Sequence, residues 1–226
     1  MSLNVKQAPM KGGKDIEPLE AATYPVRLVQ VIDLGLQPQE YQGEQKAPMR
    51  MAAFTYEFLD EFMKDADGQD MKDKPRWLTE RFPIHNIKAE KAKSTKRAKA
   101  LDPTDKANGD FFAMLGFPAL ATVVLNRGKG KNAGKFFNNI AEISPMRAKD
   151  VENAPALVNK PVAFSLDAPD VEVFRKFPEW VQNTITSNLE FSGSKLEALL
   201  KDAGENHAPP KQDAKAAEDL EEDRPF

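Results

Sequence analysis

Cationic side chains that lie close to aromatic rings are the residues of this sequence best suited to chemistry. The segment 127–137 contains three glycines and ends in Phe136 and Phe137. Its cations are Arg127, Lys129, Lys131 and Lys135. Cations neutralise phosphates and release counterions, and an aromatic ring can stack on an unpaired base. The pattern therefore indicates a β-hairpin suited to a single-stranded nucleic acid, with a merely solvated loop as the alternative. Because successive strand residues face opposite sides, only one of the two phenylalanines is expected to be exposed.

A second basic segment precedes this one. We expect a helix over residues 88–100, rich in alanine and lysine and ending before Asp102-Pro103. Its cations, opposed only by Glu90, are Lys88, Lys91, Lys93, Lys96, Arg97 and Lys99. At 100° per residue they surround most of the helix and leave a thin apolar face. Phosphates would track along it; a solvated surface helix is the alternative.

A third group lies on the predicted strand 76–84. Trp77 and Arg81 share one face of this strand, and Arg76 precedes them. Trp77 beside Arg81 makes a stacking surface for bases, and Tyr56 across the hairpin is a candidate of the same kind. The alternative is that Trp77 belongs to the core. Trp180 is expected to be packed within a predicted helix.

The sequence offers few parts for an enzyme. It has no cysteine, which excludes disulfides, thiolate metal sites and cysteine nucleophiles. Two histidines without a zinc motif make zinc catalysis improbable. The glycine-rich segment 128–135 does not match a phosphate loop, because Phe136 stands where Ser or Thr would bind Mg²⁺. We therefore expect no enzyme, cofactor or metal; the remaining enzymatic alternative is a Mg²⁺-dependent nuclease that uses Asp65, Asp67 and Asp70.

Strands dominate the elements that must position these side chains. We expect strands at 24–34, 49–62, 76–84, 119–126, 136–143 and 162–166, and helices at 88–100, 169–177, 178–190 and 195–203. This order predicts a mainly β or α+β fold. An OB-like Greek-key barrel of five or six strands, with an inserted basic helix and C-terminal helices, fits it. A flat sheet with helices on one side also fits.

Charge is distributed unevenly over the 226 residues, so the formal net charge of −3 does not exclude a polyanionic ligand. We expect a flexible arm over 1–23, one domain over 24–200 and a disordered acidic tail over 201–226. The tail has a net charge of −4 and residues 25–200 have +1, but the stretch 88–135 alone has +7. No apolar run approaches the ~20 residues of a membrane span. A soluble, cytoplasmic protein is therefore expected.

The last residues combine acids with an aromatic ring. The tail candidates are Glu218, Asp219, Glu221, Glu222, Asp223, Pro225 and Phe226. Such a segment can insert its ring into a partner's pocket while its charges meet basic residues. It can also mimic single-stranded DNA and occupy the protein's own basic surface.

This ending resembles the C-terminal tip of bacterial single-stranded DNA-binding proteins. The body, over roughly residues 24–200, resembles the single-stranded DNA-binding proteins of tailed bacteriophages. The resemblance rests on three segments: YPVRLVQVIDLGLQ (24–37), KPRW (74–77) and KSTKR…LDP (93–103). It implies an OB-type barrel that coats single strands with little sequence preference in replication, recombination and repair. It also implies an acidic tail that contacts DNA polymerase and primase-helicase in the cytoplasm of an infected bacterium. The sequence does not decide between a monomer and a homodimer.

A protein-interaction or assembly module without DNA binding is the main alternative. The segment Glu57–Asp73 has a net charge of −5 and, with the tail, offers acidic docking sites. Binding to single-stranded DNA distinguishes the two hypotheses.

Overall fold

A six-stranded sheet forms the centre of the fold. Residues 17–204 are described here from a computed structural model. The strands are β1 (Thr23–Tyr41), β2 (Glu44–Lys64), β3 (Asp70–Pro83), β4 (Pro118–Arg127), β5 (Phe136–Pro145) and β6 (Val162–Phe164). The helices are α1 (Lys93–Leu101), α2 (Ala148–Asn153), α3 (Val171–Arg175), α4 (Glu179–Thr186) and α5 (Lys195–Asp202). The expected mainly β or α+β fold is confirmed.

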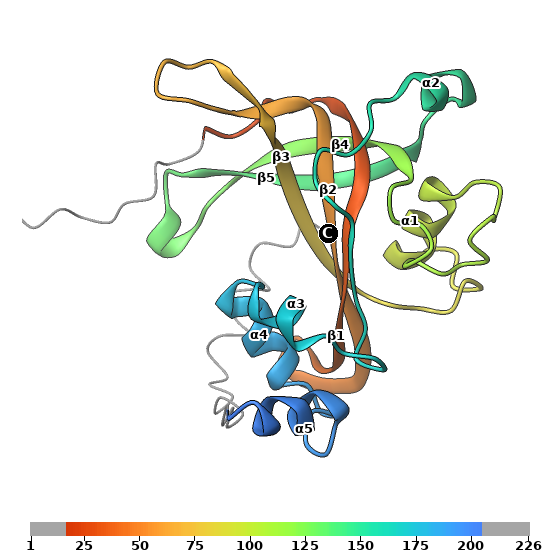
Figure 1. Ribbon diagram of the computed structural model, residues 1–226, viewed down its shortest axis with the longest axis vertical. Helices are drawn as coiled ribbons and strands as arrows, with labels where there is room; N and C mark the ends of the chain where they lie inside the picture. Colours follow the sequence, from red (N-terminus) through yellow and green to blue (C-terminus); the bar gives the residue numbers. More distant parts are fainter. Residues whose placement is uncertain (1–16, 205–226) are drawn as a thin grey trace, which may run out of the picture.

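The strand order is β3-β2-β1-β4-β5, and β6 pairs in parallel with β1. This order, with α1 inserted between β3 and β4, is compatible with a barrel of the OB type (Figure 1). The two edge strands, β3 and β5, approach each other to within 8 Å between Cα atoms. Within residues 17–204, however, no backbone ladder joins them, so a seam remains between these strands.

The segment 17–22 bridges this seam. The backbone N–H of Leu19 donates to Asn138 Oδ1 of β5 (2.7 Å), and Asn138 Nδ2 donates to the Leu19 carbonyl (2.8 Å). On the other edge, Arg76 of β3 donates to the Glu17 carbonyl (3.0 Å). Leu19 is buried in the core. The expectation of a flexible arm over 1–23 is therefore wrong for residues 17–23; residues 1–16 lie outside the described part.

The interior of this curved sheet, called the barrel below, is filled by side chains of β1 to β5 and of α1. Phe54, Tyr56 and Phe58 of β2 alternate into it and are buried. Phe54 stacks on Phe82 of β3 with ring centroids 4.5 Å apart. Phe111, from the turns after α1, packs against the Phe54 ring in a T-shaped arrangement. Burial of each such ring stabilises the fold by roughly 1.5–3 kcal/mol.

A second core lies on the other side of the long strands. A bulge at Val29, where the β1–β2 register shifts, turns Ile32 and Leu34 away from the barrel interior. There Ile32 and Leu34 pack against the C-terminal helices α3, α4 and α5. These helices lie together at one end of the β1–β2 hairpin (Figure 1).

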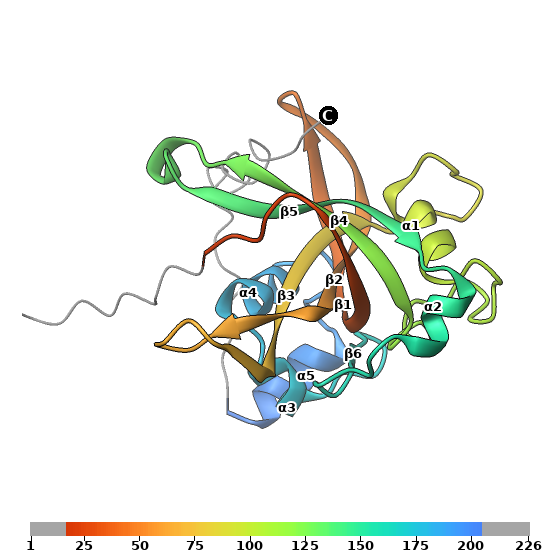
Figure 2. The same cartoon turned by 90° about the horizontal axis from the view of Figure 1, so that it is seen from above.

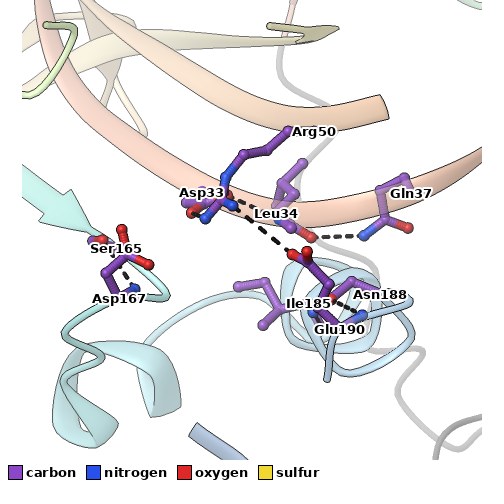
Figure 3. Close-up of polar contacts among 10 residues, drawn as sticks. Asp33, Leu34, Gln37, Arg50, Ser165, Asp167, Ile185, Asn188 and Glu190 are labelled. Carbon is purple, nitrogen blue, oxygen red and sulfur yellow. Dashed lines mark hydrogen bonds and ion pairs between the residues drawn. The ribbon is translucent and has the colours of Figure 1, made fainter. Parts of the chain in front are cut away.

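Polar contacts fix these helices to β1 and β2. Arg50 lies between Asp33, to which it donates two hydrogen bonds, and Glu190 (Figure 3). Gly35 has a φ of +79°, and a Cβ there would lie 2.5 Å from Asn188 Cγ. Glycine is therefore required at this position both by its backbone conformation and by the close approach of Asn188.

The helices differ from expectation at several points, and α4 ends at Thr186 rather than at residue 190. The basic helix begins at Lys93 rather than at residue 88. The side-chain oxygen of Asn86 accepts a hydrogen bond from the backbone N–H of Lys88. The backbone carbonyl of Asn86 accepts one from the backbone N–H of Ala89. This Asx-type turn competes with helix formation over 88–92. The short helix α2 was not predicted.

Candidate nucleic-acid interface

The β4–β5 hairpin carries the first basic group. Arg127 pairs with Phe136 at the end of the ladder, and the N–H of Gly128 donates to the Lys135 carbonyl (2.9 Å). A short 3-10 helix, Gly130–Asn132, forms the tip. A Cβ on Gly128 would lie 2.7 Å from the ring of Phe137 and 2.6 Å from the Asn132 carbonyl oxygen. The absence of a side chain at Gly128 thus lets the Phe137 ring lie against the loop.

Both phenylalanines of this hairpin are exposed, Phe136 to 54% and Phe137 to 40%. The expectation that only one would be exposed is wrong. The hairpin projects beyond the barrel, so neither face of β5 is covered at its start (Figure 1). The side chains of Arg127, Lys129 and Lys135 are also exposed, whereas that of Lys131 falls outside the described part.

The outer face of β3 carries the second group. Trp77 is 43% exposed, and its indole N–H donates to Glu57 Oε2 (3.1 Å). Glu57 is buried, and it also accepts from the backbone N–H of Val158 (2.6 Å) and from the amide of Asn159 (2.7 Å). The carboxylate therefore holds the edge of the indole while part of the ring stays open to solvent.

Beyond Trp77, the same face of β3 continues with Thr79 and Arg81. The hydroxyl of Thr79 lies 2.9 Å from that of Thr55 on β2. The Arg81 guanidinium lies 5.1 Å from the centre of the Trp180 ring on α4. Trp180 is 45% exposed, so the expectation of a packed residue is wrong. The α4 residues that face the second core are Val181 and Ile185.

Arg76 lies apart from this face. Because neighbouring strand residues point to opposite sides, Arg76 and Trp77 face different ways. The guanidinium of Arg76 instead reaches the Glu17 carbonyl at the seam (3.0 Å). Its predicted role beside Trp77 has no support in this arrangement.

Tyr56 is unsuitable for stacking on a ligand. Its side chain is fully buried, and its hydroxyl donates to Glu80 Oε1 (3.1 Å). Burial and the nearby Glu80 carboxylate raise the pKa of Tyr56 well above its ordinary value. The prediction that Tyr56 contacts bases is therefore corrected: the ring belongs to the barrel core, like Phe54 and Phe58 on the same face.

Arg97 is likewise removed from the interface, because α1 turns it inward. Its side chain is only 4% exposed and forms two hydrogen bonds with Glu80, of 2.8 and 3.0 Å. Lys93 pairs with the same carboxylate at 2.8 Å. Burial raises the pKa of Glu80, but the hydrogen bonds and charges of Arg97 and Lys93 outweigh burial and leave it below its ordinary value. These two cations hold α1 on the barrel.

The other cations of this segment, Lys88, Lys91, Lys96 and Lys99, are exposed. They lie at or before α1, which is on the side of the molecule opposite to the β4–β5 tip in both views (Figure 1 and Figure 2). A phosphate track along both basic segments, as predicted, would have to run from one side of the molecule to the other. The structure does not bring the two together.

The remaining candidates do not add to this site. Asp65 Oδ1 accepts from the N–H groups of Asp67 and Gln69, so it shapes the β2–β3 loop. Among residues 17–204, no three acidic, histidine or cysteine side chains form a group that could hold a metal ion.

The tail residues from Glu218 to Phe226 lie outside the described residues. In the part that the structure describes, no helix has the length and apolar character to cross a bilayer.

Comparison of the chain with protein-family models gives no match, and comparison with curated proteins gives none either.

Proposed function

We propose that this protein binds single-stranded DNA without strong sequence preference, through the β4–β5 hairpin and the outer face of β3. The observation that carries the proposal is the pair of exposed rings, Phe136 and Phe137, beside the exposed cations of a glycine-rich hairpin. An exposed phenylalanine costs solubility, and placing two of them among cations suits a ligand that has both phosphates and open base faces.

Trp77 supports the same ligand. Its exposed ring is held by a buried carboxylate rather than by apolar packing alone, so it is oriented before any ligand arrives. Orientation in advance lowers the entropy lost on binding. Stacking tolerates any base, and this accounts for binding without sequence readout.

The resemblance to phage single-stranded DNA-binding proteins extends the proposal to a biological role. The protein would coat and protect single strands during replication, recombination and repair in an infected bacterial cell, without catalysing a reaction. The acidic residues of 218–226 would recruit replication proteins such as DNA polymerase and primase-helicase.

Two matched variants test the DNA-binding surface. Replacing Arg127, Lys129 and Lys135 by alanine removes three cations from the hairpin, and replacing Lys88, Lys91 and Lys96 removes three from the α1 side. We expect the hairpin variant to lose at least tenfold in affinity for fluorescent oligo(dT), measured by anisotropy at low salt, and the α1 variant to lose much less. Equal losses, or no binding by the wild type, would contradict the proposal.

Single substitutions then separate stacking from charge. Phe136→Ala is expected to cost about 1–3 kcal/mol of binding free energy without changing the charge. Leu199→Ala, at an exposed apolar residue of α5 outside this surface, is the control and should bind like the wild type.

A further inference from the structure

Trp180 is a large aromatic residue of α4 that lies outside the second core. Val181 and Ile185 attach this helix to the second core, and both are buried. Trp180 precedes them on a different face of the helix and is 45% exposed. Its exposure is therefore not a sign of a loosely packed helix.

Arg81 connects Trp180 to the surface described above. The guanidinium reaches over the indole from β3, 5.1 Å from the ring centre. Arg81 lies on the same face of β3 as Trp77, four residues along the strand, which corresponds to about 13 Å. Figure 1 and Figure 2 both show α4 beside β3. One face of β3 thus carries Trp77, Thr79 and Arg81 in succession, and Arg81 reaches from this face to Trp180.

The chemistry of this pair suits an unpaired base next to a phosphate. A guanidinium plane and an indole ring both stack on bases, and the guanidinium also pairs with phosphate oxygens. A lysine in place of Arg81 would keep the charge but lose the flat stacking surface. Cation and ring together match the two alternating parts of a nucleic-acid strand.

We propose that Trp180 and Arg81 form a second base-stacking site, which binds a nucleobase of the same single strand that contacts Trp77. This inference rests on the proposed DNA binding and extends it from the sheet to the C-terminal helices. It assigns α4 a part in ligand binding beyond covering the second core.

Fluorescence can report on the two sites separately, because the chain contains two tryptophans. The variant Trp77→Phe leaves only Trp180, and Trp180→Phe leaves only Trp77. Each is titrated with unlabelled oligo(dT), while anisotropy of a labelled oligo(dT) measures binding independently. We expect the fluorescence of both single-tryptophan proteins to be quenched, each over the same concentration range as its binding curve.

Two outcomes separate the failure of this inference from that of the proposed function. If Trp77 is quenched and the labelled strand binds, but Trp180 fluorescence does not change, the second site is refuted and DNA binding stands. If the labelled strand does not bind at all, the proposed function fails, and the second site fails with it.

Affinity gives a second readout. We expect Trp180→Ala to weaken binding of oligo(dT) by about 5- to 150-fold, which corresponds to loss of one stacked base. Arg81→Lys should weaken it less than Arg81→Ala. Leu199→Ala, at an exposed apolar residue on α5, is the matched control and should bind like the wild type. Wild-type affinity in Trp180→Ala would overturn the inference.

Discussion

Glu80 illustrates how a single residue can engage, within the fold, side chains that the sequence offers for ligand binding. The carboxylate is buried under α1, where Arg97, Lys93 and the hydroxyl of Tyr56 surround it. Two cations and a tyrosine that the sequence offers for ligand binding are thereby used within the fold.

Removal of this carboxylate should destabilise the protein strongly. Glu80→Ala leaves the buried Arg97 without its partner, so we expect the free energy of unfolding to fall by about 3–5 kcal/mol in urea titrations. Glu90→Ala removes the exposed partner that lies 3.8 Å from Lys99, and it should cost less than about 1 kcal/mol. Similar losses in both variants would mean that Glu80 is not a buried anchor.

The same carboxylate makes stability depend on pH. Its pKa is lower in the folded protein than in the unfolded chain, so its contribution is fully present above the unfolded value of about 4.3. It is lost as the pH falls from there through the folded pKa. The stability difference between the wild type and Glu80→Gln should therefore shrink as the pH is lowered from 7 towards 3, as measured by urea unfolding. A difference that grows on acidification would reverse the assigned direction.

The sequence predicts the burial of some candidate residues and not of others. Tyr56 shares its side of β2 with Phe54 and Phe58, so alternation alone was enough to place it in the core. The ion pair of Arg97 joins residues 17 positions apart on different elements, and no local pattern indicates it. Exposure of Trp180 depends on which face of α4 meets the second core, which the helix sequence by itself does not determine.

At the scale of elements, the segment 17–22 matters most because it connects the edge strands β3 and β5. Within residues 17–204, no backbone ladder pairs these two strands. Leu19 is the buried anchor of the segment. The sequence predicts all six strands from their β-branched and aromatic runs, but not their full lengths: β1 continues to Tyr41 rather than ending at residue 34, and β3 begins at Asp70 rather than at residue 76. It does not predict this segment, because one buried leucine and a few hydrogen bonds to Asn138 and Arg76 carry the interaction.

Truncation of this anchor should loosen the seam. We expect Leu19→Ala to lower the free energy of unfolding by about 2–5 kcal/mol, the usual cost for a buried leucine. Hydrogen exchange should increase first in the amides of β3 and β5. Leu199→Ala, at an exposed position of α5, is the control and should cost much less. Unchanged stability in Leu19→Ala would show that the seam does not depend on the segment.

At the scale of the whole molecule, charge is arranged by side rather than by total. The hairpin cations and the lysines near α1 lie on opposite sides, although the chain brings them within one basic stretch (Figure 1). Charges separated by more than about 8–10 Å are screened at physiological salt. Each side therefore acts on a ligand independently, and the formal net charge of −3 describes neither.

Salt dependence of oligo(dT) binding by the wild type tests the central claim most directly. Contact with several phosphates predicts that the logarithm of the association constant falls linearly with the logarithm of salt concentration, by about 0.7 for each contact. The slope should become shallower in the hairpin variant that lacks Arg127, Lys129 and Lys135, and change little in the α1 variant. A flat line for the wild type would contradict the account.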